Sequence, residues 1–250
     1  MAYRAVMMKK FSLLLILAGI NFTSYAMESI ENRQEDMISS LLTQQVQQNI
    51  SIENSVNALV KRFPEKADII LKFALENYPN KYKEIITGTI HAEPALSAAV
   101  VAAVLHAKIA SCSDVVKIAI DIEPAYANEI IQAAYKNSED PIQDIVTVAV
   151  NTEPFISDSL ISNAKDKTTM LNIFIGIVKA VPDQVVSIVK TALHLFPADS
   201  ADVIKNAVNS SHKQFDKEIV NAAVNAGIDK ELAINAAIKG GAKRDEFAKL

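Results

Sequence analysis

Apolar residues recur along this chain with a 15-residue period between positions 64 and 239. Within each period, the sixth, seventh, tenth and eleventh residues after the starting residue are mostly apolar, and the tenth is usually alanine. The period that starts at Pro64 places Ile70, Leu71, Ala74 and Leu75 at these positions. A weaker copy starts at Asn49. The later starting residues are Pro79, Pro94, Ile109, Pro124, Glu139, Pro154, Lys167, Pro182, Pro197, Lys213 and Gly227.

Apolar residues spaced i, i+1, i+4 and i+5 lie on one stripe of a helix, whereas adjacent residues of a strand point to opposite faces. The pattern therefore predicts one short helix per period. A helix that fits within a 15-residue period together with its turn is too short to persist alone in water, so these helices must stack on one another. We expect an all-α fold, an α-solenoid of short antiparallel helices built on a 15-residue (30-residue paired) repeat.

The expected helix starts carry residues suited to a first turn. Proline fits the first helical position because its backbone angle is preset and that position needs no N–H donor. In periods without proline, capping residues take its place. These expected starts are Ser113 and Asp114, Thr168 and Thr169, Asp216 and Asp229.

Residues 1–26 have the three parts of a secretory signal peptide. Lys9 and Lys10 form a basic start, residues 11–20 form an apolar run, and residues 24–26 (Ser-Tyr-Ala) form a small-x-small cleavage site. An uncleaved anchor remains an alternative, and either Met1 or Met8 is the initiator. The apolar run is shorter than the roughly 20 residues that a membrane span needs. We therefore expect cleavage after Ala26, no membrane span in the mature chain and a periplasmic or secreted bacterial protein.

The remaining chain divides into three predicted parts. Residues 27–48 form a polar N-terminal cap or arm, in which Met37 and Leu41 belong to a loose helical stripe. This part is a helix that packs on the first repeat, a mobile tail or an oligomerising coiled coil. Residues 49–239 form the helical repeat domain. Gly240 and Gly241 predict a helix stop, and residues 240–250 form a charged C-terminal tail.

Composition and charge narrow the possible partners. Half of the residues are hydrophobic, 22% are charged, and the net charge is −4. Removal of residues 1–26 would take away three positive charges and leave −7. A chain this acidic is not expected to bind nucleic acid. Cys112, the only cysteine, lies in a turn-like segment, and a loop position or a reactive or dimer-forming thiol are both open interpretations.

Motifs for catalysis and metal binding are missing from the sequence. The four histidines lack a second ligand at helical spacing, and there is no nucleophile elbow, phosphate-binding glycine loop or C-x-x-C pair. We therefore assign no catalytic, cofactor-binding or metal-binding residue, and expect neither a cofactor nor enzymatic activity. The general plan resembles α-solenoids such as tetratricopeptide and HEAT repeats. Their consensus residues are absent, so no functional residue carries over.

One polar feature repeats along the chain. Glu93, Glu123 and Glu153 each precede a proline at every second period, at equivalent corners of alternate expected helices. A carboxylate there is favoured by the helix dipole, which is a structural role. The other interpretation is an acidic ridge that binds a basic partner, since solenoids present extended surfaces.

These patterns favour an exported, non-enzymatic helical-repeat scaffold that binds a protein or peptide partner. The alternative is a small-ligand carrier or an enzyme whose site lies in the concave groove of the solenoid. A single deep pocket with converging polar groups would favour this alternative. A continuous ridge or an exposed apolar patch would favour the scaffold.

Overall fold

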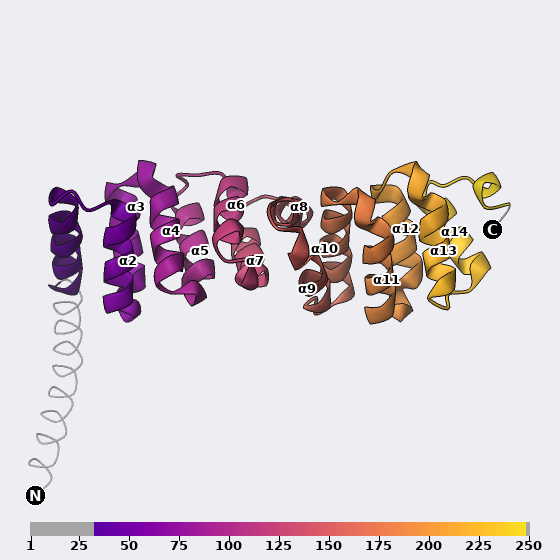
Figure 1. The fold of residues 1–250 in the computed structure, drawn as a ribbon, viewed down its shortest axis with the longest axis horizontal. Coiled ribbons are helices and arrows are strands. Elements are labelled where there is room, and N and C mark those ends of the chain that lie inside the picture. Colours follow the sequence, from indigo (N-terminus) through magenta and orange to yellow (C-terminus); the bar gives the residue numbers. More distant parts are fainter. Residues whose placement is uncertain (1–32, 249–250) are drawn as a thin grey trace, which may run out of the picture.

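A computed structural model describes residues 33–248 of the chain. Within this range the protein consists of helices joined by short turns, and no residue in it belongs to a strand. The helices pack in neighbouring pairs along one elongated row, which runs from the N-terminal to the C-terminal end of the molecule (Figure 1). This arrangement fits an all-α repeat fold.

Residues 33–47 are helical and precede a row of α-helices. That row is α2 (Ile52–Arg62), α3 (Ala67–Asn77), α4 (Tyr82–Ala92), α5 (Ser97–His106), α6 (Cys112–Ile122), α7 (Ala127–Asn137), α8 (Ile142–Thr152), α9 (Ser157–Ser162), α10 (Lys167–Ala180), α11 (Val185–Leu195), α12 (Ser200–Ser210), α13 (Asp216–Asn225) and α14 (Lys230–Gly240). Single 3₁₀ turns precede many of them: η1 (Pro64–Lys66), η2 (Pro79–Lys81), η3 (Pro94–Leu96), η4 (Pro124–Tyr126), η5 (Pro154–Ile156), η6 (Pro182–Gln184), η7 (Pro197–Asp199) and η8 (Lys213–Phe215). A last turn, η9 (Arg244–Phe247), follows α14. Because α9 has six residues and α10 has fourteen, a regular 15-residue repeat stays a prediction.

The helices form two layers. The even-numbered helices contact one another in order from α2 to α14 and form one layer. In the other layer, α3 contacts α5, α5 contacts α7, α9 contacts α11, and α11 contacts α13. Consecutive helices also touch, so the core lies between the layers along the whole row.

The apolar stripe predicted from the sequence is buried in most helices. In α7, Ile130, Ile131 and Ala134 are fully or almost fully buried, as their positions in the period predicted. Tyr135, which the same count places in the stripe, is instead 49% exposed. The next helix of its layer, α9, ends already at Ser162, so the C-terminal end of α7 has less helix beside it.

The helix starts differ from the sequence prediction in a consistent way. Each proline that starts a sequence period is the first residue of a 3₁₀ turn. The α-helix begins three residues later, as Ala67 follows Pro64. The predicted capping residues of α6 and α10 are also wrong. The hydroxyl of Ser111 accepts a hydrogen bond from the Asp114 amide, and the Asp166 carboxylate accepts one from Thr169. Both true caps lie farther from the buried stripe than predicted.

At the last two helices, the capping prediction has one success and one error. Asp229 is the N-cap of α14, because its carboxylate accepts a hydrogen bond from the Leu232 amide. Asp216 is instead the first residue of α13 and makes no capping hydrogen bond with its side chain. Its carboxyl is buried, and among the described residues its Oδ1 has no hydrogen-bond partner.

Three glycines lie where helices of the even-numbered layer approach each other closely. A Cβ atom on Gly88 of α4 would lie 2.4 Å from the Glu53 carbonyl oxygen of α2. Gly176 of α10 faces α8, and Gly240 of α14 faces α12, at similar distances. Side chains reinforce two of these contacts, since Asn57 and Thr147 donate hydrogen bonds of 3.1 Å to the carbonyl oxygens of Gly88 and Gly176. The backbones therefore meet where any side chain would hold them apart.

Both ends of the row are covered by chain segments outside α2–α14. In the segment 33–47, Ile38 and Leu42 are buried and join the core, whereas Met37 of the predicted stripe is 44% exposed. After Gly241, whose φ of +113° ends α14, Ala242 and Phe247 are buried against the core. The predicted domain boundaries at residues 26, 48 and 239 stay predictions.

The predicted signal peptide, residues 1–26, lies outside the described residues. Among the residues that are described, no single helix is long and apolar enough to cross a membrane. The helix pair 167–180 and 182–195 reaches the required length and composition only when joined across a bend of 114°.

Candidate functional site

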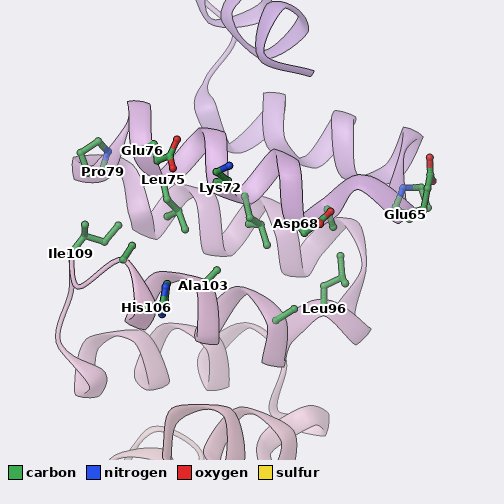
Figure 2. Close-up of a pocket in the computed structure, with 15 residues that line it drawn as sticks. Glu65, Asp68, Lys72, Leu75, Glu76, Pro79, Leu96, Ala103, His106 and Ile109 are labelled. Carbon is green, nitrogen blue, oxygen red and sulfur yellow. The ribbon is translucent and has the colours of Figure 1, made fainter. Parts of the chain in front are cut away.

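A groove of about 830 Å³ separates α3 from α5 (Figure 2). It follows α3 from Pro64 to Pro79, and its other wall runs along α5 from Leu96 to Ile109. The two helices contact each other much less than α5 contacts α7. The lining residues are Pro64, Glu65, Ala67, Asp68, Leu71, Lys72, Leu75, Glu76, Pro79, Leu96, Ala99, Ala103, His106, Ala107 and Ile109.

The α5 wall of the groove is apolar. The sequence from Glu93 to His106 contains no charged residue between these two. Ala99, Ala103 and Ala107 are four residues apart and so lie on one side of the helix, which is the side that lines the groove. Ala99 and Ala107 are exposed. Helix α5 is therefore apolar even on a side that no helix of the described range 33–248 covers.

The α3 wall combines an apolar base with a charged edge. Leu71 and Leu75 are buried at the base, and Figure 2 shows Leu75 pointing from α3 toward the opposite wall. Three exposed acidic residues follow the outer edge of this wall, namely Glu65, Asp68 and Glu76. The edge therefore carries more negative than positive charge.

Lys72 lies within this acidic edge but has a partner of its own. Its Nζ lies 3.4 Å from the Glu35 carboxylate of the segment 33–47. Both side chains are partly exposed, so the pair contributes little stability. The pair does affect the charge of the groove. Lys72 is the only lysine among the described lining residues, and its positive charge is already paired with a carboxylate from another segment.

The residues of the predicted acidic ridge occupy equivalent corners. Glu93, Glu123 and Glu153 follow α4, α6 and α8, and each precedes a 3₁₀ turn. Their amides donate hydrogen bonds of 2.9–3.0 Å to carbonyl oxygens four residues earlier. The Glu153 side chain also accepts a hydrogen bond from the Phe155 amide at 3.2 Å, at the start of η5. The three corners lie at the same end of neighbouring helices, and their role in binding stays a prediction.

Phe155 is a further candidate, which the repeat pattern did not indicate. Its side chain is 94% exposed, far more than the other exposed large apolar residues of the described chain. It follows Glu153 and Pro154 at the corner between α8 and α9, where the corresponding residues of two earlier corners are Ala95 and Ala125. The signal was present in the sequence, since this corner is the only one of the three with an aromatic residue after the proline.

The side chains of His91 and His106 are exposed, whereas that of Cys112 is buried. Cys112 is buried and is the first residue of α6. Its predicted position in a turn is therefore wrong. Burial raises the pKa of its thiol, which disfavours the reactive thiolate. His106 lines the groove, and His91 lies 4.0 Å from Glu53. Among the described residues, no group of three or more His, Cys, Asp or Glu side chains is arranged to hold a metal ion.

The groove itself was not predicted from the sequence. The period places Leu71 and Leu75 in the buried stripe, which is correct, but it does not say which pairs of helices stay apart. The available signal was the alanine series on α5, because exposed positions of a helix are usually polar. Comparisons with protein-family models, with curated proteins and with solved structures found no match for this chain.

Proposed function

We propose that this protein is an exported, non-enzymatic helical-repeat scaffold that binds a protein or peptide partner in the groove between α3 and α5. The observation that carries this proposal is the apolar α5 wall, which is open to solvent along the groove. Exposed contiguous apolar surface on a folded protein is typical of interaction sites.

The proposal includes a solenoid built on the 15-residue repeat. Support comes from the first helices, because the starts of α2 to α9, from Ile52 to Ser157, follow one another at a constant 15-residue spacing. The contacts between alternate helices are those of an array in which each unit touches its neighbours. Such arrays bind partners along extended surfaces rather than in enclosed catalytic clefts.

A binding role is favoured over catalysis by the lining of the groove. Among its described lining residues there is no serine, threonine, cysteine or tyrosine beside His106 that could act as a nucleophile. The charged residues Glu65, Asp68 and Glu76 lie along one edge and do not converge on a point. Catalytic sites need such convergence to hold reacting groups together.

The acidic ridge belongs to the same proposal as a second contact region. Glu93 lies three residues before Leu96, whose amide donates a hydrogen bond to the Glu93 carbonyl at 2.9 Å and whose side chain lines the groove. A partner that enters the groove at this end is therefore close to the first residue of the ridge. Phe155, farther along, provides an aromatic anchor of the kind that dominates many interfaces.

A photo-crosslinking amino acid at Ala99 tests this function in the source cells, with Asn221 on α13 as the exposed control position outside the groove. We expect a protein adduct at Ala99 that is absent at Asn221. The captured protein, once purified, should bind the purified scaffold in a direct titration and lose binding to the Ala99→Phe variant.

A small apolar ligand is the second candidate, because a groove of about 830 Å³ lies within the size range of small-molecule sites. Native mass spectrometry of the protein purified from its source distinguishes the two. A stoichiometric bound lipid or metabolite, together with no protein adduct at Ala99, would replace the scaffold by a carrier.

Export is the part of the proposal that rests on residues 1–26 alone. Intact-mass measurement of the protein from its source should find an N-terminus at Met27, in a periplasmic or secreted fraction. A chain that retains Met1 or Met8 and remains with cytoplasmic proteins would refute export while leaving the groove untouched.

A further inference from the structure

We infer that the occupant of the groove is an amphipathic α-helix of about three turns, with its apolar face on α5 and a basic edge along α3. This inference rests on the proposed function and names the partner class of the same site. Helix α5 indicates an apolar occupant. A helix that is apolar on all sides is normally covered on all sides, yet the side of α5 that carries Ala99 and Ala107 is exposed.

The shape of the groove selects a helix as the occupant. The groove follows the whole of α3, whose eleven residues span about 16 Å, or three helical turns. The α5 wall carries alanines at positions 99, 103 and 107, whose side chains are short. Another helix backbone can therefore approach closely and place larger side chains beside them. Apolar residues at i, i+3, i+4 and i+7 of a bound helix would occupy the space above Leu71 and Leu75.

The charges on α3 select a basic edge. Glu65, Asp68 and Glu76 follow one another along α3 and the turn before it, so they face one side of the groove over its full length. Lys72 is paired with Glu35 and offsets little of this charge toward the groove. The opposite wall has no acid among its described lining residues that would attract a cation, and its ionisable residue is His106. A bound helix therefore gains from lysine or arginine on the edge that faces α3 and from none on the other edge.

Two designed peptides and the purified protein test this inference by fluorescence anisotropy. Both peptides are long enough to form about four helical turns and share the same leucine face. One peptide carries lysine on one edge, and the other carries glutamate at the same positions. We expect the lysine peptide to bind about tenfold more tightly than the glutamate peptide, since each exposed ion pair contributes up to a few-fold. Equal affinities would overturn the basic edge, and no binding of either peptide would overturn the helical occupant.

Matched variants locate the binding. Asp68→Lys reverses one charge of the edge and should weaken the lysine peptide about fivefold or more. Asp158→Lys makes the same change at the corresponding position of α9, four residues after Pro154, which is exposed and outside the groove lining. This control should leave the affinity within twofold. Equal losses in the two variants would show a general charge effect and overturn the site.

Filling the groove gives a test that does not depend on charge. Ala99→Phe places a ring on the α5 wall at an exposed position, so the helical circular dichroism spectrum should be unchanged while peptide affinity falls about tenfold or more. Self-association of the protein that Ala99→Phe abolishes would identify a second copy as the occupant and overturn the inference. If the peptides fail while a cellular protein crosslinks to Ala99 and binds in titration, the inference fails and the proposed function stands.

Discussion

The helix pairs α2–α4 and α3–α5 are neighbours in the array, but one is closed and the other is open. In the first, Gly88 allows the backbone of α4 to approach the Glu53 carbonyl of α2, and contacts between the two helices are extensive. In the second, α3 and α5 touch only sparsely and the groove lies between them. Short turns of the same kind link α2 to α3, α3 to α4 and α4 to α5. The difference between the two pairs therefore arises from the side chains that meet.

The comparison shows how a groove forms without a dedicated loop. Because α3 and α5 are tied to α4 by short turns, drawing α2 and α4 together shortens one layer and spreads the other. The next part of the array follows the opposite pattern, since α5 and α7 pack extensively while α4 and α6 contact each other less. The close approach at Gly88 therefore supports the opening between α3 and α5 on the other side of the array.

The largest expected effect is at the closed pair. Gly88→Ala would place a Cβ 2.4 Å from the Glu53 carbonyl oxygen, so the backbones must move apart. We expect a loss of about 3 kcal/mol in the free energy of unfolding, although alanine alone favours a helix. Urea denaturation measures this, with Thr87→Ala as the neighbouring control. A stabilised Gly88→Ala variant would mean that the close approach is absent in solution.

The second prediction contrasts the buried Asp216 with the exposed acids of the open groove. Asp216 is 2% exposed, and its burial, with a smaller effect from Glu246, raises its carboxyl pKa to about 6. The folded state therefore binds this proton more tightly than the unfolded state does. Protonation of Asp216 stabilises the fold at low pH, and this stabilisation is lost as the pH rises through about 6. The ionised carboxyl costs about 2–3 kcal/mol at pH 7.

Asp216→Asn removes this cost. The variant should be more stable than the unaltered protein at pH 7, and its stability should change less between pH 5 and pH 7. Denaturation at several pH values measures both effects. Identical pH profiles for the two proteins would show that Asp216 is not buried as the structure has it.

The third prediction places the same side chain in closed and open packing. Ala134 of α7 is fully buried, so Ala134→Leu should lower the free energy of unfolding by about 1–3 kcal/mol through overpacking. Ala99 lines the open groove and is exposed, so Ala99→Leu should change stability by less than about 0.5 kcal/mol.

Gln132→Leu, two residues from Ala134 on the exposed side of α7, is a second control and should also be tolerated. Thermal unfolding of the three variants gives the comparison. If Gln132→Leu unfolds the protein while Ala134→Leu has no effect, the buried face of α7 is assigned incorrectly.

The smallest expected effect concerns the hydrogen bond that supports the closed pair. Asn57 of α2 donates to the Gly88 carbonyl at 3.1 Å, so Asn57→Ala should cost about 0.5–1.5 kcal/mol. Asn54→Ala on the same helix changes an exposed residue and corrects for the helix preference of alanine. Chemical denaturation should rank Asn57→Ala below Asn54→Ala, and the reverse order would rule out a contribution from this bond.

The sequence by itself determined the helical class and most of the buried face. The spacing of Ile130, Ile131 and Ala134 permits only one helical stripe, and burial follows because short helices must cover their apolar sides. The N-cap Asp229 was also evident, since capping depends on residues three positions apart. The caps Ser111 and Asp166 were missed by two or more residues because several polar residues precede each helix.

Only the tertiary structure decided which helices meet closely and which remain apart. Whether Gly88 approaches Glu53 depends on residues far apart in the chain, and no local pattern relates them. The exposure of Tyr135 likewise depends on the early end of α9 at Ser162. Periodicity determines the direction in which each side chain points, whereas the distance between helices depends on the side chains of both and on the turns that link them. The groove between α3 and α5 is a property of that distance, which is why it emerged from the fold and not from the sequence pattern.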